Sequence, residues 1–168
     1  FDLKLPAKCD NEYWEQGDAF QQPPTKLSLM EFFNRLITLN HILTLMLKMP
    51  MSDFHCFLIL NFCFIKYSTN HSKTLIGLSD DRWEEKAVME LDSSLNTRFN
   101  SIPEHFRWDA ACPDDIFFDQ SVALYCSYYH VQILVHHPFI PVLQRSNPTN
   151  FISLTICTNA TRACCHVA

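Results

Sequence analysis

Histidines near the end of the longest apolar helical run are the first residues whose spacing could do chemistry. His130 and His137 are seven positions apart, so on a helix both lie on one face, and His136 precedes His137 directly. A zinc site would need a further ligand, such as Cys165 or His166, and no zinc-type spacing supplies one. We therefore predict no metal site here, and we expect His137 to be a polar group at a helix end, where imidazole suits the free carbonyls.

A thiol next to an imidazole occurs once, in Cys164-Cys165-His166. Such a pair has the residue types of a thiol nucleophile and its base. Adjacent residues on a helix do not face each other, however, and this segment has a helical pattern. The sequence therefore predicts no catalytic dyad at this point.

Two pairs of acidic residues, Asp80-Asp81 and Asp114-Asp115, have the composition of a general acid–base pair. Each pair stands just before an expected helix, where a carboxylate accepts hydrogen bonds from free amides and suits the helix dipole. The motifs G-x-x-x-x-G-K, G-x-S-x-G and H-E-x-x-H do not occur. We predict capping for both pairs and a chain that is not an enzyme and binds no cofactor.

The cysteines do not form a recognisable framework. None of them is paired as C-x-x-C, which is the usual half-site of structural zinc. Cys126 and Cys157 stand among apolar helical neighbours, where a free thiol behaves as a small hydrophobic group. We expect reduced thiols in an intracellular protein for all eight cysteines: Cys9, Cys56, Cys63, Cys112, Cys126, Cys157, Cys164 and Cys165.

Composition sets the class of protein. The 168 residues suit one domain, and 48% of them are hydrophobic and 18% charged, which is enough for a packed core. The net charge is −5 without any long basic run, so direct DNA contact by this chain is not expected. The chain begins with Phe1 and ends at Ala168 inside an expected helix, so we interpret it as an internal fragment of a longer protein.

Hydrophobic periodicity predicts an all-α fold of four to five helices behind an extended N-terminal strap with aromatic anchors. Ser28 and Glu31 form a predicted capping box. The expected elements are the strap at 1–26 and helices from Ser28 to about Met46, from Asp80 or Asp81 to about Ser101, from Phe117 to His136 before Pro138, and from Asn150 or Phe151 onward. The second of these helices should bury Trp83, Val88, Leu91, Leu95 and Phe99 and expose Glu84, Glu85, Lys86, Glu90 and Asp92.

Residues 54–65 are almost entirely apolar, interrupted by His55 and Asn61. A membrane-spanning helix needs about 20 apolar residues, and this run is shorter. A buried helix or strand is therefore favoured over a membrane span.

Segments in a fixed order carry one further pattern: Leu5-Pro6, Asp10-Asn11-Glu12-Tyr13-Trp14-Glu15, Phe20-Gln21-Gln22-Pro23, Ser28-Leu29, Trp83-Glu84, Glu90-Leu91-Asp92-Ser93-Ser94-Leu95-Asn96, Ile102-Pro103-Glu104-His105-Phe106-Arg107-Trp108, Phe117-Phe118-Asp119-Gln120-Ser121, Tyr128 to Ile140, and Ile156-Cys157-Thr158-Asn159-Ala160. Together they resemble the middle homology region of fungal-specific transcription factors, a regulatory domain also described as xylanolytic-activator-like. Residues 1–168 would be part of such a domain.

The resemblance implies a non-catalytic nuclear regulator of RNA polymerase II transcription. In that family DNA is bound by an N-terminal cluster of six cysteines and two zinc ions, which this chain does not contain, so zinc and DNA binding would belong to the parent protein. A coregulator or small-molecule effector and a homodimer are the implied partners, and no membrane is involved. The alternatives are a metal- or thiol-dependent enzyme and a membrane-associated helical protein anchored by residues 54–65.

Two features depart from the family pattern. The family commonly has arginine at the position of His137. The histidine in this chain lacks the fixed charge and the bidentate hydrogen-bond donor of an arginine. Residues 49–66 have no counterpart, and their Phe, Leu, Ile and Cys content is what a pyrimidine-rich tract encodes. Our hypothesis is that residues 49–66 derive from an unspliced intron.

Overall fold

The computed structural model describes residues 4–14, 22–23, 26–47, 83–140 and 148–168. Within these residues the chain is helical and contains no strand, which confirms the predicted all-α class. The α-helices are α1 (Met30–Leu47), α3 (Trp83–Asn100), α4 (Asp115–His136) and α5 (Pro148–Val167), and the 3-10 turns are η1 (Asn11–Tyr13), η2 (Glu104–Phe106) and η3 (His137–Phe139).

Several expectations fall outside the described residues. They concern the apolar run at 54–65, the proposed insertion at 49–66, the caps at Asp80 and Asp81, and the predicted burial of Trp83 and exposure of Glu84 and Glu85, whose side chains are not described. Among the helices that the structure does describe, none combines the length and the hydropathy that a bilayer crossing requires.

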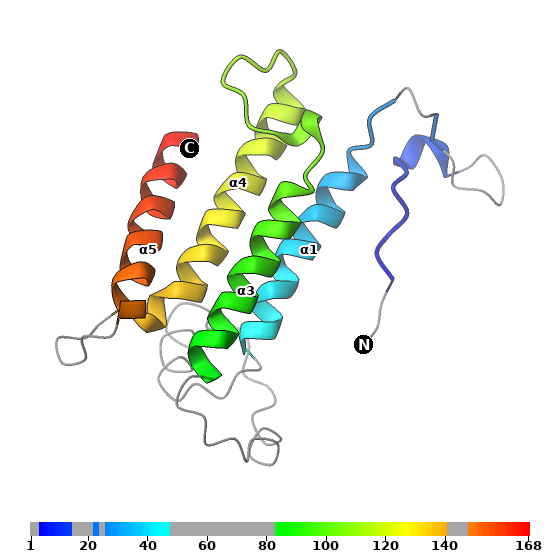
Figure 1. Cartoon of the computed structure of the whole chain (residues 1–168). Coiled ribbons are helices and arrows are strands. Elements are labelled where there is room, and N and C mark those ends of the chain that lie inside the picture. The colour runs from blue at the N-terminus through cyan, green and yellow to red at the C-terminus, as the bar shows by residue number, and fades with distance from the viewer. Residues whose placement is uncertain (1–3, 15–21, 24–25, 48–82, 141–147) are drawn as a thin grey trace, which may run out of the picture.

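Helix α4 is the centre of the fold. Helices α1 and α3 pack against α4 and against each other, while α5 runs along α4 at the edge of the bundle (Figure 1). The sequence of this helix is apolar on nearly all sides, and such a helix belongs in the core. The buried cluster consists of Leu39, Ile42, Met46, Val88, Leu91, Leu95, Ile102, Phe106, Leu124, Tyr128, Val131, Leu134 and Val135.

The ends of α4 follow from its sequence. The Asp114 carboxylate accepts hydrogen bonds from the amides of Ile116 (2.9 Å) and Phe117 (3.1 Å), which confirms the predicted capping role of Asp114. The helix begins at Asp115, two residues before the predicted start. It ends at His136, and the chain continues in the η3 turn that contains Pro138.

Helix α5 begins at Pro148, slightly earlier than predicted. A proline is favoured in the first turn of a helix, since its missing N–H would have no partner within the helix there. In α3 the predicted buried stripe is confirmed for Val88, Leu91 and Leu95, and Phe99 packs against the core. Asp92 is the exception on the predicted polar face, because its side chain is only 24% exposed and contacts α4.

The prediction that Ser28 and Glu31 cap α1 through a capping box is wrong, because their side chains form other hydrogen bonds. The Asp10 carboxylate accepts the Met30 amide and the Ser28 hydroxyl, both at 3.1 Å, so a residue of the strap caps the helix. Glu31 binds Lys8 (2.8 Å) and Arg35 (2.9 Å). A carboxylate brought by the strap is a stronger acceptor than a hydroxyl, which explains why Asp10 takes the place of Ser28.

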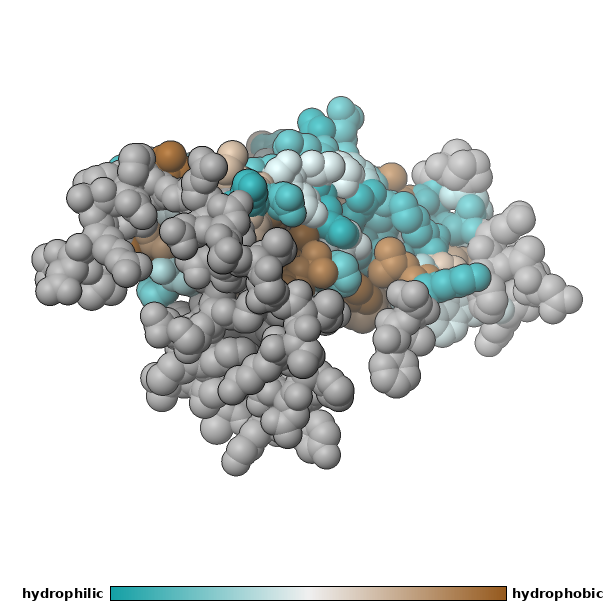
Figure 2. Space-filling model, turned by 60° about the horizontal axis from the view of Figure 1, so that its bottom comes forward, coloured by the Kyte–Doolittle hydropathy of each residue, from teal (hydrophilic) through white to brown (hydrophobic). Residues whose placement is uncertain are grey.

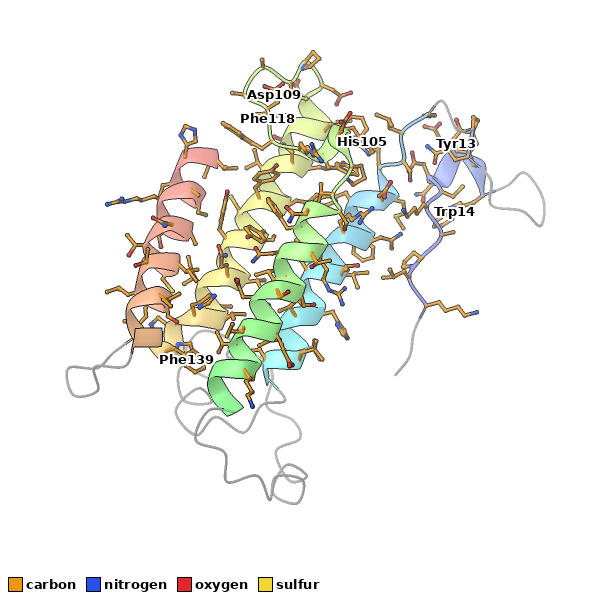
Figure 3. The ribbon with its side chains drawn as sticks, in the orientation of Figure 1. Tyr13, Trp14, His105, Asp109, Phe118 and Phe139 are labelled. Atoms are coloured by element: carbon orange, nitrogen blue, oxygen red, sulfur yellow. The ribbon has the colours of Figure 1, made fainter. Side chains whose placement is uncertain are left out.

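The most buried side chain of the described strap is a cysteine and not an aromatic residue. Cys9 is 1% exposed, whereas Trp14 is 48% exposed, and the Trp14 indole donates to the Cys9 carbonyl at 3.1 Å. Tyr13 and Trp14 lie at the strap, and Phe139 lies at the opposite end of the helices from His105 (Figure 3). Of the predicted aromatic anchors, Trp14 is therefore a surface residue and Tyr13 is half-buried, while Phe20 lies outside the described residues.

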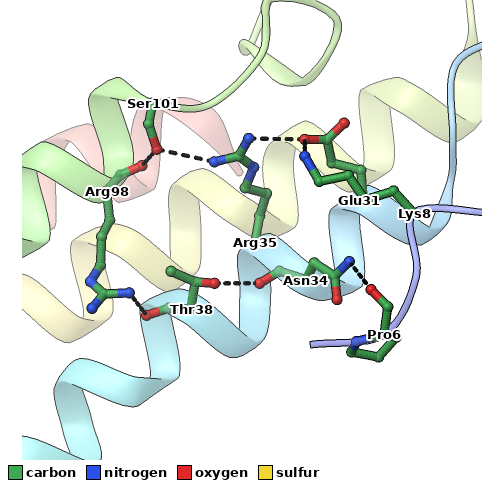
Figure 4. A network of polar contacts seen from close by, with 8 residues as sticks. All are labelled: Pro6, Lys8, Glu31, Asn34, Arg35, Thr38, Arg98 and Ser101. Carbon is green, nitrogen blue, oxygen red and sulfur yellow. Dashed lines mark hydrogen bonds and ion pairs between the residues drawn. The ribbon is translucent and has the colours of Figure 1, made fainter. Parts of the chain in front are cut away.

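Polar contacts tie the strap, α1 and α3 together (Figure 4). Arg35 reaches from Glu31 to the Ser101 hydroxyl at 3.0 Å, and so connects α1 with the end of α3. Burial works to raise the pKa of Glu31, but hydrogen bonds from Lys8 and Arg35 outweigh it and lower the pKa. Asn34, 4% exposed, donates to the Pro6 carbonyl at 2.9 Å, which fixes the strap along α1.

Candidate functional site

The most buried polar site of the described residues is centred on His136. This side chain lies near the end of α4 and is 5% exposed. Its Nε2 is 3.2 Å from Oδ1 of Asp92 on α3, and its Nδ1 is 3.3 Å from Oγ of Ser153 on α5. One imidazole therefore links three helices whose partner residues are 44 and 17 positions away in sequence.

Further polar side chains of α3 and α4 surround the Asp92 carboxylate. Asn96 donates to Asp92 at 2.9 Å and Gln132 donates to it at 3.4 Å. The Tyr128 hydroxyl donates to the Asn96 side-chain oxygen. We call these residues the Asp92 network: Asp92, Asn96, Tyr128, Gln132, His136 and Ser153.

Electrostatics favour a charged Asp92 beside a protonated Tyr128. The hydrogen bond with His136 lowers the pKa of Asp92 against the opposing effect of burial, and Gln132 and Asn96 lower it further. Burial, assisted by the Asp92 charge, raises the pKa of Tyr128 to about 12. The Tyr128 ring also stacks on Phe99 with centroids 3.8 Å apart, which holds its hydroxyl in place.

Asp92, His136 and Ser153 have the composition of the acid–base–nucleophile triad of hydrolases. Ser153 is 1% exposed, so a substrate cannot reach its hydroxyl in this conformation. Nucleophilic catalysis requires such access together with donors that stabilise the developing oxyanion. The geometry therefore fits a buried link between helices, in which each ring nitrogen of His136 has a partner.

The structure separates the histidines that the sequence analysis grouped. His130 and His137 are exposed, whereas His136 is buried and turns toward α3 and α5. His137 is the C-cap residue of α4, and its amide donates to the Ile133 carbonyl. His137 is thus at the end of α4 as predicted, but the histidine that links the helices is its neighbour His136.

The residues considered near the C-terminus also lie apart from the network. Cys165 and His166 are exposed, and the His166 ring lies against Trp108 at 5.3 Å. In the described part of the chain, no three histidine, cysteine or acidic side chains are grouped so that they could hold a metal ion.

Sequence reasoning missed the Asp92 network, although one signal was present. Tyr128, Gln132 and His136 are spaced by four along an otherwise apolar helix, which places three polar groups on one face. Asp92 and Asn96 have the same spacing on α3. Two polar rows on helices that both belong to the core indicate that the rows face each other.

A second feature is an open groove between the strap and the first turns of α1 and α4. Its volume is about 640 Å³, and its lining residues are Asp10, Asn11, Glu12, Lys26, Leu27, Leu29, Met30, Asp114, Ile116 and Phe117. Leu27, Leu29 and Ile116 are 47%, 39% and 55% exposed, so hydrophobic surface is available there. Figure 2 shows another face, on which hydrophobic side chains reach the surface between hydrophilic ones.

Comparison with known proteins gives no relative. No family model matches the chain, and neither the curated proteins nor the solved structures contain a match.

Proposed function

We propose that this chain is the non-catalytic regulatory domain of a fungal DNA-binding transcription factor that controls RNA polymerase II transcription in the nucleus. Zinc and DNA would be bound by a separate module of the parent protein. The observation that carries the proposal is where the resembling segments lie. The segments around Asp92, His136 and Cys157 meet along α4, through the His136–Asp92 contact and the hydrogen bond from Cys157 to the Ile133 carbonyl.

In the proposed mechanism, binding in the groove changes the arrangement of the strap relative to α1 and α4. The groove between the strap, α1 and α4 would receive a coregulator or a small-molecule effector, since it combines exposed leucine and isoleucine side chains with acidic ones. The Asp92 network would keep α3, α4 and α5 in one arrangement. The occupied and empty states would then differ in how the attached DNA-binding module acts.

A reporter assay tests the regulatory role. The full chain is fused between a heterologous DNA-binding module and an activation segment, and transcription of a reporter is measured in a fungal host. We expect the wild-type chain to change reporter output relative to a fusion without it, and the groove variant Ile116→Asp to alter that change. Met89→Ala, at a 69% exposed position on α3, is the matched control. Equal output with and without the chain, at equal protein levels, would argue against the proposal.

The transcript of the locus tests the proposed zinc-cluster module of the parent protein and the intron hypothesis. Six cysteines in a C-x2-C-x6-C type array upstream of Phe1 would support a zinc-cluster parent protein, and their absence from the message would contradict it. Reading the same transcript across codons 48–67 tests the intron hypothesis, because a mature message that retains codons 49–66 excludes it.

A further inference from the structure

Two contacts between α4 and α5 define which residues of the two helices lie opposite each other. The two helices run along each other in opposite directions (Figure 1). The Cys157 thiol on α5 donates to the carbonyl of Ile133 on α4, at 3.7 Å. His136 and Ser153 meet nearby, three residues further along α4 and four residues back along α5. The two contacts therefore belong to one antiparallel register.

The same register brings two other cysteines to one level. Seven residues, or about 10.5 Å of helix, lead back from Ile133 to Cys126 on α4 and forward from Cys157 to Cys164 on α5. Since the helices are antiparallel, both steps go in the same direction. The register therefore places Cys126 and Cys164 at the same level of the α4–α5 interface, one on each helix. Both side chains are free cysteines of intermediate exposure, so they are neither sealed in the core nor fully solvated.

We propose that Cys126 and Cys164 are a redox modification site, where a peroxide oxidant converts two neighbouring thiols into a disulfide between α4 and α5. The site is independent of the proposed role in transcription. In a reducing compartment such a disulfide is transient and sensory rather than structural. Because the register sets Cys126 and Cys164 opposite each other on packed helices, the bond can form without a change in the order of the helices.

The chemistry balances with hydrogen peroxide as the oxidant. The Cys164 thiolate attacks one peroxide oxygen, the O–O bond breaks, and Cys164 becomes a sulfenic acid while water is released. The Cys126 sulfur then attacks the Cys164 sulfur, the S–O bond breaks, and a second water leaves. Two thiols and one peroxide thus give one disulfide and two waters. Burial, and after it the neighbouring Cys164, raises the pKa of Cys126 and disfavours its thiolate, so we assign the resolving step to Cys126 and the first attack to Cys164.

Peptide mapping of the full chain provides the test. The folded protein is treated with a small excess of hydrogen peroxide, its remaining thiols are alkylated, and it is digested with trypsin without reduction. Cleavage after Arg107, Arg145 and Arg162 releases peptide 108–145 with Cys126 and peptide 163–168 with Cys164. We expect these peptides to be cross-linked, two of the eight thiols to be lost, and dithiothreitol to reverse both changes.

Matched variants assign the bond, since the same peptides also contain Cys112 and Cys165. The link is expected to persist in the double variant Cys112→Ser, Cys165→Ser and to disappear in Cys126→Ser and in Cys164→Ser. Fragmentation of the cross-linked wild-type peptide locates the bond if a variant does not fold. A bond to Cys112 or Cys165, disulfide-linked dimers in place of the internal bond, or equal formation in urea-unfolded chain would overturn the proposal.

Discussion

At the scale of single residues, His136 is stable in the core because both of its ring nitrogens have partners. Replacement by alanine leaves Asp92 and Ser153 without that partner and opens a cavity. We expect His136→Ala to lower the free energy of unfolding by about 3 kcal/mol. Urea denaturation measures the change, and His130→Ala, exposed on the same helix, should stay within about 0.5 kcal/mol of wild type. Equal effects of the two substitutions would show that the network is dispensable.

Asp92 predicts a pH dependence. Its pKa is lowered in the folded chain, chiefly by the hydrogen bond with His136, so its contribution to stability is present above the ordinary carboxyl pKa of about 3.9. That contribution is lost as the pH falls through the lowered, folded-state pKa. The difference in Tm between wild type and Asp92→Asn should therefore be fully present at neutral pH and shrink as the pH falls below about 4.

Circular dichroism across that pH range measures the two Tm values. Asp119→Asn, at an exposed position of α4, is the control and should show no such convergence. A difference for Asp92→Asn that stays constant into strong acid would contradict the assignment of the effect to the carboxylate charge.

The residues of the Asp92 network were hard to predict for a physical reason. Periodicity assigns a residue to a face of its own helix, but it does not say which other helix that face meets. Asp92 was predicted to face water together with its charged neighbours, and only the approach of α4 turns it into a partner for His136. Asp114 was predicted correctly because capping depends on residues two and three positions away.

At the scale of elements, Asp10 couples the strap to α1. Its carboxylate takes the Met30 amide and the Ser28 hydroxyl, and Gln22 contacts its second oxygen at 3.2 Å. Asp10→Ala should cost about 1 kcal/mol and expose the strap to trypsin at Lys8. Limited proteolysis measures the second effect. Glu12→Ala, which removes only an exposed ion pair, should leave the cleavage rate unchanged.

The η2 turn joins α3 to α4 through a buried phenylalanine. Phe106 is 0% exposed, and its ring lies 5.6 Å from that of Phe117. We expect Phe106→Ala to lower the free energy of unfolding by about 3 to 5 kcal/mol, because a large cavity remains. Met89→Ala, on the surface of α3, should change it by less than about 0.5 kcal/mol in the same urea titration. Similar midpoints for both would contradict a core role for this turn.

The sequence predicted an element correctly where the deciding residues lie within that element or next to it. The stop at Pro138 and the buried stripe of α3 depend on spacing within one segment, and both agree with the structure. The start of α1 did not follow in this way, since its cap comes from a residue 20 positions earlier. The capping-box motif spans only Ser28 to Glu31, so it does not include Asp10 of the strap, which accepts the Met30 amide in place of Ser28.

At the scale of the whole molecule, the central place of α4 was predictable and the packing order around it was not. A helix that is apolar on nearly all sides must be surrounded, whichever helices do so. The choice of α1 and α3 on one part of its surface and α5 on another depends on contacts between segments far apart in sequence.

Helix α5 makes its extensive contacts with α4 and the η3 turn, whereas α4 is covered by α1, α3 and α5. An outer helix held mainly through one neighbour needs less free energy to detach than the helix it covers. Backbone amides of α5 should therefore exchange with deuterium faster than those of α4 under native conditions. Each detachment would break the contact between His136 and Ser153 and bring Ser153, Cys157 and Ala160 into water, so we expect the Asp92 network to lose its α5 partner before the packing of α1, α3 and α4 is lost.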